Sequence, residues 1–288
     1  VGAILGVAIG LTGIDGHWKG NGSGSFGWTF NVSNADLQSL PEGARQQTYV
    51  VTINDDHGGT TTQNIVVTLN GVNDAPVISD LGGTVNYVEN AAPLVIDGSI
   101  TIVDVDDGNI DSATVTITNF VAGQDELGFA TQNGITGNFV NGVLTLTGSA
   151  TKEQYEAALE SVTYRNGSES PSGTTRVLEF RVNDGHVNSN AGAVSVTVEP
   201  VDDAPVIAGL DNFSINEGLV GALIDTFTVS DLDTASALSF RVLDGTTVDP
   251  RFVVVAASGT TFGQPGIYEL RLAPGQSLDF EPENLDGN

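Results

Sequence analysis

The chain has 288 residues, with 36 acidic side chains, 9 basic ones and a formal net charge of -27 at pH 7. A polyanion of this kind excludes nucleic acids and anionic membrane surfaces as charge-driven partners, and it favours the binding of cations. Hydrophobic residues make up 40% of the chain, which is enough to form packed cores and argues against disorder. Because cysteine is absent, these residues form no disulfide, zinc–thiolate site or thiol nucleophile.

The stretch VGAILGVAIGL at 1–11 alternates apolar residues with mostly small ones. It has no basic flank and is well short of the ~20 residues needed to cross a bilayer. It therefore predicts a β-strand that enters a truncated domain. The chain holds no Met, not even at position 1, so we expect a fragment or processed piece whose targeting signal lies elsewhere.

A glycine-rich stretch, GSGSFG at 22–27, matches the spacing of the dinucleotide-binding fingerprint. That fingerprint needs a helix directly after it, whereas WTFNV has the composition of a strand, so the pattern favours a hairpin. Trp18 and Trp28 flank this hairpin, and we expect them in the core of the first sandwich, with a sugar-stacking platform as the alternative. NADLQSL at 34–40 predicts a single helical turn.

The chain repeats itself at a spacing of 129 residues. VTLNGVNDAPVI at 67–78 and VTVEPVDDAPVI at 196–207 agree at eight of twelve positions. The match extends upstream without a gap to the Asn-Asp pairs at 54–55 and 183–184. Self-similarity over this length indicates tandem domains, and the shared DAPVI element marks stiff linkers because proline follows Asn/Asp-rich residues there.

Between the linkers, apolar residues recur at every second position, as in strands with one buried face. Such runs are rich in Val, Ile and Thr, and Gly, Asn and Asp separate them. They predict antiparallel sheets, which in domains of this size pack as sandwiches. The alternating sets are Tyr49, Val51 and Ile53; Ile65, Val67 and Leu69; Ala113, Val115 and Ile117; Leu178, Phe180 and Val182; Val194, Val196 and Val198; and Tyr268, Leu270 and Leu272.

One segment has a convincing helical pattern, ATKEQYEAALES at 150–161. Thr151 and Gln154 have the spacing of a capping box. We expect a short crossover helix on the sandwich. Its apolar face comprises Tyr155, Ala158, Leu159 and Val162.

The linkers divide the chain into three parts. Residues 1–73 are expected to be the C-terminal part of one β-sandwich, and 74–203 a complete sandwich with one short helix. Residues 204–288 begin a third sandwich that is truncated at its C-terminus.

Acidic residues fall at matching places in the repeats. Each linker carries an Asn-Asp or Asp-Asp pair, a Glu follows it, and an Asp-x-Asp pair comes next. Ca²⁺ takes 6–8 oxygen ligands, and no single loop here supplies that many, whereas loops from the touching ends of two sandwiches plus the linker would. Carboxylates gathered in this way repel one another, and bound Ca²⁺ would turn that repulsion into attraction and lock the domains in line.

Three motifs of the last part, NEG at 216–218, SDLD at 230–233 and LDFE at 278–281, resemble the calcium motifs of a cadherin repeat. The NDAP linker, with INDDHGG and VNDGH upstream of the two linkers, resembles the repeats of giant bacterial surface proteins. In those proteins, VCBS-type and cadherin-like domains are strung in tandem in adhesins of the RTX secretion class. The resemblance covers nearly the whole chain and implies an all-β fold, a linear array of antiparallel Greek-key sandwiches of immunoglobulin-like and cadherin-like type.

The geometry of that family implies that metal ligands are shared across each joint. The first set is Asn73, Asp74, Asp104, Asp106 and Asp184. The second set is Glu89, Asp202, Asp203, Asp231 and Asp233. The third set, which would serve a joint with a further domain, is Glu217, Asp279 and Glu281.

Two departures from the family pattern stand out. The middle domain shows no clear Asp-x-Glu motif, so its second site is expected to hold fewer ions. Asn109 also lies one place early for the family's Asp-x-Asp-x-Gly-x-Asn. Three further acidic residues are expected to be solvated turn residues and not ligands. They are Asp107, Asp111 and Asp125.

The resemblance implies a calcium-dependent segment of an extracellular, surface-attached bacterial adhesin, whose repeats extend a ligand-binding region from the cell. The implied partners are calcium and the neighbouring repeats of the same chain. A further partner would be a glycan or protein of another cell surface, or a second copy of the protein, as in homophilic adhesion or biofilms. Membrane insertion of this segment is not expected. Two alternatives stay open: a glycan- or protein-binding recognition module, and accessory domains of a secreted enzyme. Neither G-x-S-x-G nor H-E-x-x-H occurs, and nothing sets one carboxylate pair apart, so we expect no catalytic residue.

Overall fold

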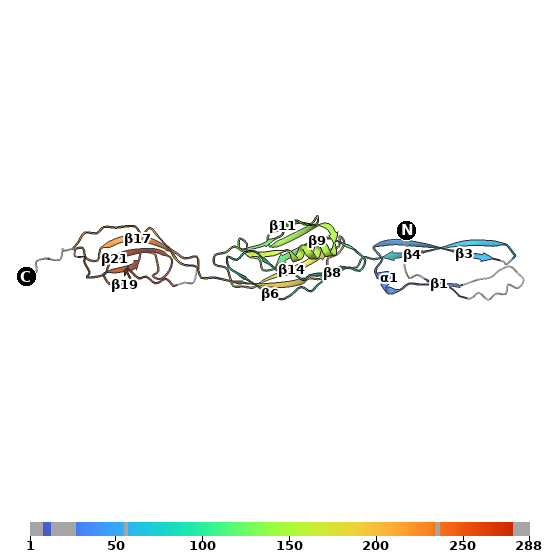
Figure 1. Cartoon of the computed structure of the whole chain (residues 1–288), viewed down its shortest axis with the longest axis horizontal. Helices are drawn as coiled ribbons and strands as arrows, with labels where there is room; N and C mark the ends of the chain where they lie inside the picture. The colour runs from blue at the N-terminus through green and yellow to red at the C-terminus, as the bar shows by residue number, and fades with distance from the viewer. Residues whose placement is uncertain (1–7, 13–26, 55–56, 234–236, 279–288) are drawn as a thin grey trace, which may run out of the picture. The chain divides into compact units, whose positions relative to one another are not determined.

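The structure is a computed structural model that describes residues 8–12, 27–54, 57–233 and 237–278 (Figure 1). Contacts divide the chain into two compact units. The first unit comprises Val1–Tyr87, Ala91–Asn166 and Thr174–Thr197, and the second comprises Val88–Asn90, Gly167–Gly173 and Val198–Asn288.

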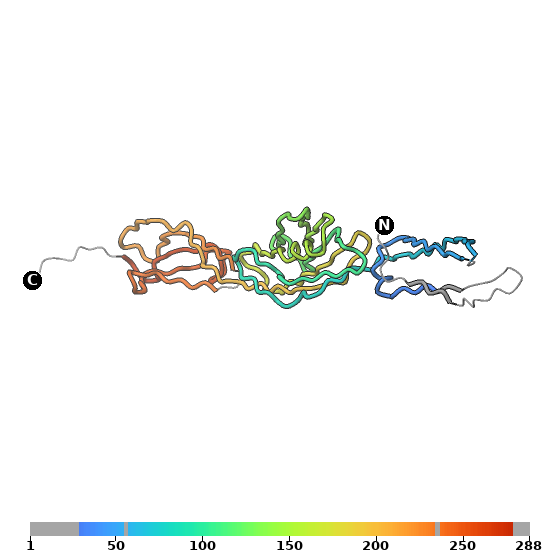
Figure 2. The backbone as a smooth tube through the Cα atoms, turned by 45° about the vertical axis from the view of Figure 1, so that its right-hand side comes forward, coloured from blue at the N-terminus to red at the C-terminus, as the bar shows by residue number. Residues whose placement is uncertain are grey.

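The part of the chain before the first linker contains two antiparallel strand pairs and a short helix. The strands β3 and β4 run side by side over their whole length, with Gly43 opposite Gly71 (Figure 2). Ser33 caps the helix by accepting a hydrogen bond from the Asp36 N–H at 3.1 Å, which confirms the predicted turn at 34–40. The elements are β1 (Ala8–Thr12), β2 (Gly27–Asn31), α1 (Asn34–Gln38), β3 (Gly43–Asn54) and β4 (Thr60–Gly71).

The predicted strand WTFNV is confirmed, because β2 pairs with β1 in antiparallel register. The predicted alternation along β3 and β4 is confirmed at five of its six positions, because Tyr49, Val51, Ile65, Val67 and Leu69 are half-buried between exposed neighbours. The prediction is wrong for Ile53, which is exposed near the end of β3. Other predictions for this part fall outside the described residues. They concern the beginning of the strand at 1–11, most of the glycine-rich hairpin, Trp18 and the side chain of Trp28.

The middle part of the chain forms three sheets. The largest has the strand order β11-β12-β9-β14-β15-β6, a second has the order β10-β13-β7, and β5 pairs with β8. Its strands are β5 (Val77–Ser79), β6 (Thr84–Val88), β7 (Leu94–Val95), β8 (Thr101–Val103), β9 (Asn109–Ile117), β10 (Asp125–Gly128), β11 (Thr136–Val140), β12 (Val143–Thr151), β13 (Thr163–Asn166), β14 (Arg176–Asn183) and β15 (Gly192–Glu199).

Alternation along these strands places one face of the large sheet in a core. Ala113, Val115 and Ile117 are each at most 3% exposed, and the threonines between them are half-buried. Tyr87 of β6 packs edge-on against Tyr164 of β13, with ring centroids 5.4 Å apart, which joins the large sheet to the three-stranded one. The two sheets therefore enclose a common core in the manner of a β-sandwich.

The predicted helix is α2 (Lys152–Glu160), and it packs against β8, β9 and β12 (Figure 1). Thr151 and Gln154 form the predicted capping box, in which each side chain bonds to the backbone N–H of the other. The predicted apolar face is also confirmed. Tyr155, Ala158, Leu159 and Val162 are all fully buried.

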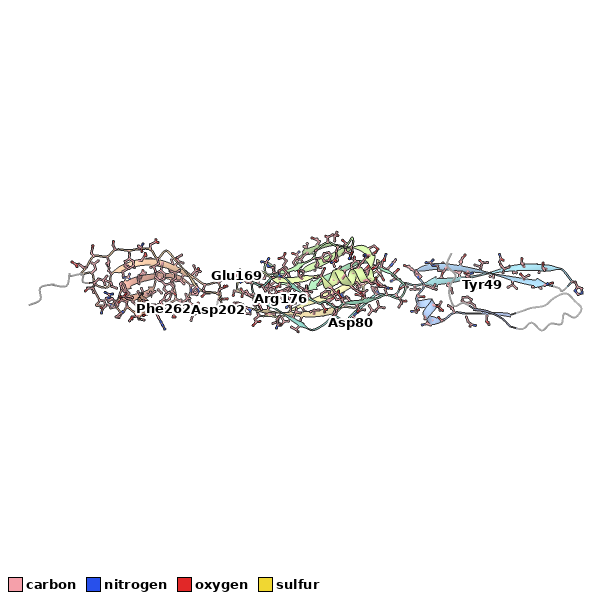
Figure 3. All side chains as sticks on the ribbon, in the orientation of Figure 1. Tyr49, Asp80, Glu169, Arg176, Asp202 and Phe262 are labelled. Atoms are coloured by element: carbon pink, nitrogen blue, oxygen red, sulfur yellow. The ribbon has the colours of Figure 1, made fainter. Side chains whose placement is uncertain are left out.

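Asp125 corrects one expectation. It is 5% exposed, and its Oδ2 accepts a hydrogen bond from Nε of the fully buried Arg176 at 2.8 Å. Its Oδ1 accepts from the hydroxyl of Tyr164 at 2.6 Å and from Nδ2 of Asn166 at 2.9 Å. The prediction that Asp125 is a solvated turn residue is wrong, because the buried Arg176 of β14 balances its charge. Figure 3 shows the position of Arg176 in the middle part of the chain.

The last part of the chain contains a sheet of order β16-β17-β21-β20 and the pair β18-β19. Its buried core consists of Phe227, Val229, Tyr268 and Leu270, with Phe240 packed against it. The predicted alternation of Tyr268, Leu270 and Leu272 is confirmed. The strands are β16 (Val206–Ala208), β17 (Leu223–Ser230), β18 (Leu243–Asp244), β19 (Thr247–Val248), β20 (Phe252–Ala256) and β21 (Gly266–Leu272).

The all-β class of antiparallel sheets is thus confirmed. In the described residues, neither α1 nor α2 has the length and apolar character needed to span a bilayer. The domain limits at 73/74 and 203/204 stay predictions.

Candidate metal sites

The first predicted set of ligands lies at strand ends. Asn73 and Asp74 follow β4, Asp104 and Asp106 follow β8, and Asp184 follows β14. Polar loops at strand ends suit carboxylates, because their own backbone N–H groups bond to the side chains in Asx turns. We call these five residues the first cluster.

Hydrogen bonds connect all five residues of the first cluster. Asn73 Nδ2 donates to Asp184 Oδ2 at 2.9 Å and to the backbone oxygen of Asp74 at 3.0 Å. The Asp74 N–H donates to both carboxylate oxygens of Asp106 at 3.3 Å. The Asp106 N–H in turn donates to Asp104 Oδ1 at 3.2 Å. The structure therefore brings together the whole set that the family resemblance implied for the first joint.

Burial makes this cluster costly without a cation. Asp104, Asp106 and Asp184 are only 7%, 9% and 7% exposed. Asp104 Oδ2 and Asn73 Oδ1 are buried and have no hydrogen-bond partner. A buried polar oxygen without a hydrogen-bond partner is rare and unfavourable, so both the carboxylate oxygen and the amide oxygen are available to coordinate a cation.

The pKa values of the carboxylates reflect this burial and the repulsion between neighbouring charges. Burial and the neighbouring Asp104 raise the pKa of Asp106 above its ordinary value. Burial, then repulsion from Asp104 and Asp184, raises the pKa of Asp107. Burial also acts to raise the pKa of Asp184, but hydrogen bonds from the Val187 N–H and Asn73 outweigh it, so that pKa is lowered.

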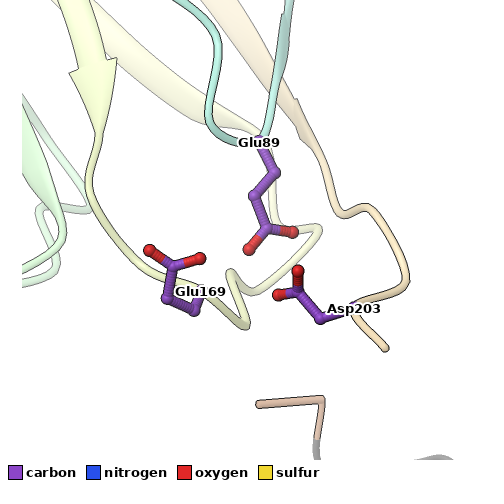
Figure 4. A group of neighbouring side chains, drawn as sticks. All are labelled: Glu89, Glu169 and Asp203. Atoms are coloured by element: carbon purple, nitrogen blue, oxygen red, sulfur yellow. The ribbon is translucent and has the colours of Figure 1, made fainter. Parts of the chain in front are cut away.

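A second group of carboxylates lies in the second unit. One oxygen each from Glu89, Glu169 and Asp203 lie within 4.8 Å of one another, and the three side chains point toward one another (Figure 4). The Asp203 N–H donates to Asp233 Oδ2. The Asp233 N–H donates to Asp231 Oδ1 at 3.0 Å. We call these five residues the second cluster.

The second cluster also contains buried oxygens without a hydrogen-bond partner, Glu89 Oε1, Asp203 Oδ2 and Asp231 Oδ2. Glu89 itself is 5% exposed, and its other oxygen accepts the Val201 N–H at 2.8 Å. Burial and repulsion, first from Asp233 and then from Glu169, raise the pKa of Asp203. Of the seven such buried side-chain atoms found in the described residues, five therefore lie in the two clusters.

The two clusters share one bonding pattern. The second linker residue, Asp74 or Asp203, donates its N–H to the second Asp of the Asp-x-Asp pair. That Asp donates its own N–H to the first Asp of the pair. The internal repeat thus extends from sequence to hydrogen bonding.

Other predicted ligands are placed differently. Asp202 is exposed, and its charge contributes to the raised pKa of Asp203. Glu217 is exposed in a turn where the next N–H, that of Gly218, donates to Leu278 O at 3.1 Å. Asp279 and Glu281, which follow Leu278, lie outside the described residues.

Glu169 is the residue that sequence reasoning missed. It lies in the loop between β13 and β14, where Asn90 Nδ2 donates to its Oε2 at 3.1 Å. It occupies the second cluster although the middle domain has no Asp-x-Glu motif. The only signal in the sequence was a Glu in a Ser- and Gly-rich loop, NGSES, which on its own is typical of a solvated turn.

The chemistry of both clusters fits a hard divalent cation. The side-chain donors are carboxylate and amide oxygens, which suit Ca²⁺, Mg²⁺ or Mn²⁺ and not the softer metals. Among these, Ca²⁺ accepts the largest and least regular ligand sets. Residues Asn73, Asp104, Asp106 and Asp184 would hold an ion in the first cluster, and Glu89, Glu169, Asp203 and Asp231 one in the second.

Comparison with known proteins gives limited similarity. No protein-family model matches the chain. A protein named Halomucin, from Haloquadratum walsbyi (strain DSM 16790 / HBSQ001), is 33% identical over 139 residues, which are 46% of this chain and 2% of Halomucin. The chain thus corresponds to a very small part of the curated relative that it matches.

Two solved cadherin structures align with most of the chain. Drosophila N-cadherin EC1-4 aligns at 14% identity and a TM-score of 0.26, over 86% of this chain and 53% of that one. The human Desmocollin-1 ectodomain aligns at 12% identity and a TM-score of 0.28, over 84% and 41%. At such TM-scores neither alignment carries an argument, and the fold class rests on the sheets themselves.

Proposed function

We propose that the chain is a calcium-binding segment of an extracellular cell-adhesion protein. In this proposal, Ca²⁺ bound by the two clusters restricts the linkers between successive sandwiches, and the repeats hold a ligand-binding region away from the cell surface. The observation that carries the proposal is the set of five buried, unpartnered oxygens in the two clusters. A cation is the simplest partner that satisfies all of them and offsets the repulsion between neighbouring carboxylates.

Electrostatics supports a structural role for the ion. With a net charge of -27, the chain repels itself, and the acidic clusters concentrate that repulsion near the linkers. Linker residues such as Asp74 and Asp203 are bonded to the Asp-x-Asp pair of the domain that follows. An ion bound there would hold linker and domain together, and its removal would free the linker.

Calorimetric titration and small-angle scattering of the whole chain test this proposal. We expect several Ca²⁺ ions to bind, and a longer, stiffer particle in calcium than in chelator. The variant Asp104→Asn with Asp203→Asn should lose most of both effects. A matched control, Asp97→Asn with Asp225→Asn, removes two carboxylates that also accept backbone N–H groups but lie outside both clusters. Identical scattering in calcium and in chelator would refute the proposal.

The finer assignment is also a proposal. The linker and motif resemblance supports VCBS-type and cadherin-like repeats of a bacterial RTX-class surface adhesin, with domains at 1–73, 74–203 and 204–288. A longer sequence around these residues would test it, since it should contain further repeats with NDAP-type linkers. Sedimentation in calcium and in chelator would test homotypic contacts, because a chain that stays monomeric in both does not bind itself.

A further inference from the structure

Helix α2 has a charged stripe that the proposed function does not by itself require. Lys152, Glu156 and Glu160 are spaced four residues apart and lie on one side of the helix. All three are half-buried, whereas the apolar face next to them fills the core. Their partners are backbone groups of the segment that ends in the first cluster.

The three side chains form hydrogen bonds with this segment at regular intervals, and we call this set of bonds the ladder. Glu160 Oε1 accepts the Ile100 N–H at 3.0 Å, and Glu156 Oε1 accepts the Ile102 N–H at 2.7 Å. Lys152 Nζ donates to the backbone oxygens of Asp104 at 2.8 Å and of Asp107 at 2.9 Å.

The ladder is possible because two periods match. Four residues of a helix advance by about 6 Å, and two residues of a strand by about 6.6 Å. Side chains at 152, 156 and 160 therefore meet backbone groups at 104, 102 and 100 in succession. The helix thus takes the place of a neighbouring strand along β8.

This role of the helix matters because, among the strands that the structure describes, β8 pairs only with β5. The outer edge of β5 is covered in the same manner, since Asn190 accepts the Ile78 N–H and donates to the Ile78 oxygen, both at 2.9 Å. The narrow β5–β8 ribbon is therefore held by side chains on both edges. Without them its backbone N–H groups would be buried and unpaired, which is unfavourable.

We infer that Lys152 and Glu156 are positioning residues for the first cluster, a role that rests on the calcium binding proposed above. Glu156 holds the strand that leads to Asp104, and Lys152 bonds to the backbone at both ends of the loop 104–107. Because Lys152 bonds to carbonyl oxygens, the carboxylates of Asp104 and Asp106 stay directed to the cluster. The loop is thereby kept in a shape suited to a cation before the cation arrives.

Charge and positioning predict opposite effects for Lys152. If Lys152 acted only through its charge, Lys152→Met would strengthen calcium binding, since a cation near the carboxylates is removed. If it positions the loop, the same change weakens binding. For Glu156, Glu156→Gln keeps an oxygen for the Ile102 N–H, whereas Glu156→Ala removes it, so only the alanine variant should weaken binding strongly.

The test is a calcium titration of the whole isotope-labelled chain, followed by amide resonances near each cluster. We expect Lys152→Met and Glu156→Ala to weaken binding at the first cluster by about tenfold, and to leave the second cluster, in the other unit, unchanged. Glu156→Gln should restore most of the affinity. Arg165→Met is the matched charge control, because Arg165 forms an exposed ion pair with Glu126.

Hydrogen exchange in chelator supplies a readout without calcium. Glu156→Ala should speed exchange of the Ile102 amide, whose hydrogen-bond acceptor it removes. Lys152→Met should speed exchange of the Asp106 and Asp107 amides in the loop that Lys152 holds. Core amides of β9 and β14 should keep their protection in both variants, which would show that the fold persists. Unchanged or tighter binding in Lys152→Met, or equal weakening at both clusters, would overturn the inference while leaving calcium binding intact. A parent chain without saturable binding at either cluster would overturn the proposed function, and this inference with it.

Discussion

Asn73 donates its side-chain N–H to the carboxylate of Asp184 over 2.9 Å, although 111 residues separate the two in sequence. The linker is thereby tied to the loop between β14 and β15. The other side-chain atom of Asn73, Oδ1, is buried without a partner. One side chain thus bonds to the protein and presents a free oxygen in the first cluster.

Asn73→Asp should make the first cluster more dependent on calcium. The change replaces a donor by a second carboxylate facing Asp184, and the equivalent position of the next repeat, Asp202, is already acidic. In chelator we expect a loss of about 1–3 kcal/mol, from the lost hydrogen bond and from repulsion. In calcium the loss should shrink, because an added carboxylate binds the ion. Calorimetry in both buffers checks this, and an equal loss in both would contradict it.

Asp104→Asn with Asp106→Asn should lower thermal stability in calcium far more than in chelator. A calcium ion that binds only the folded state stabilises it by about 2.7 kcal/mol when free calcium is at a hundred times the Kd. The variant loses this stabilisation because it loses the site. In chelator the Asn side chain at 104 still accepts the N–H groups of Asp106 and Asp107. Equal losses under both conditions would mean that these residues act only as turn caps.

Glu169→Gln should weaken calcium binding at the second cluster alone. The change keeps an oxygen in place but removes a charge from a three-carboxylate group. Because the residue is exposed, its replacement should alter the stability of the metal-free chain by less than about 0.5 kcal/mol. Site-resolved titration would detect the effect, and wild-type affinity at the second cluster would exclude Glu169 as a ligand.

In metal-free protein, Asp106 and Asp184 should respond to pH with opposite signs. The folded pKa of Asp106 lies above its ordinary value of 3.8, so its charge destabilises the fold at neutral pH, and this cost disappears as the pH falls through the raised pKa. The folded pKa of Asp184 lies below 3.8, so its stabilising effect is present above 3.8 and is lost as the pH falls through the lowered pKa.

Asp106→Asn should therefore gain stability relative to the parent at pH 7, and the gain should fade toward pH 4. Asp184→Asn should lose stability at pH 7, and its loss should fade at lower pH. Urea unfolding of demetallated protein across this range measures both. If the stability difference between each variant and the parent did not change with pH, the pKa values of Asp106 and Asp184 would not be shifted by folding.

Arg176→Met should destabilise the fold of the middle part of the chain by about 3–5 kcal/mol, because it leaves the buried carboxylate of Asp125 without its cation. The loss should be the same in calcium and in chelator, since Asp125 belongs to neither cluster. Arg165→Met, which breaks an exposed ion pair, should cost less than about 1 kcal/mol. Denaturant unfolding compares the two variants, and similar losses would argue against a structural role for the buried pair.

Much of the fold was predictable because its signals are local. Alternation at every second residue identified the strands that carry Val115, Phe180 and Tyr268, and these residues are buried as expected. A capping box and an apolar face with residues three and four positions apart identified α2 in the same way. The first cluster was predictable from a resemblance carried by short motifs at fixed places in the repeat.

The roles of Glu169 and Asp125 could not be predicted from the sequence, and the reason is the same for both. Each is an acidic residue in a loop-like sequence, and nothing near it distinguishes a ligand or a buried ion pair from a solvated turn. Glu169 becomes part of a cluster only because its loop lies beside Glu89 and Asp203. Asp125 is buried only because Arg176 reaches it from another sheet.

The all-β class, the long helical pattern at 150–161 and the Asn-Asp and Asp-Asp linker pairs could be established from the sequence, since periodicity and repetition are visible in the order of residues without knowledge of their contacts. The tertiary structure alone decided which oxygens lack partners, which loop completes the second cluster, and that Lys152 and Glu156 hold the segment before Asp104. These features depend on residues tens of positions apart in the chain, and only the packing of sheets and helix brings them within bonding distance.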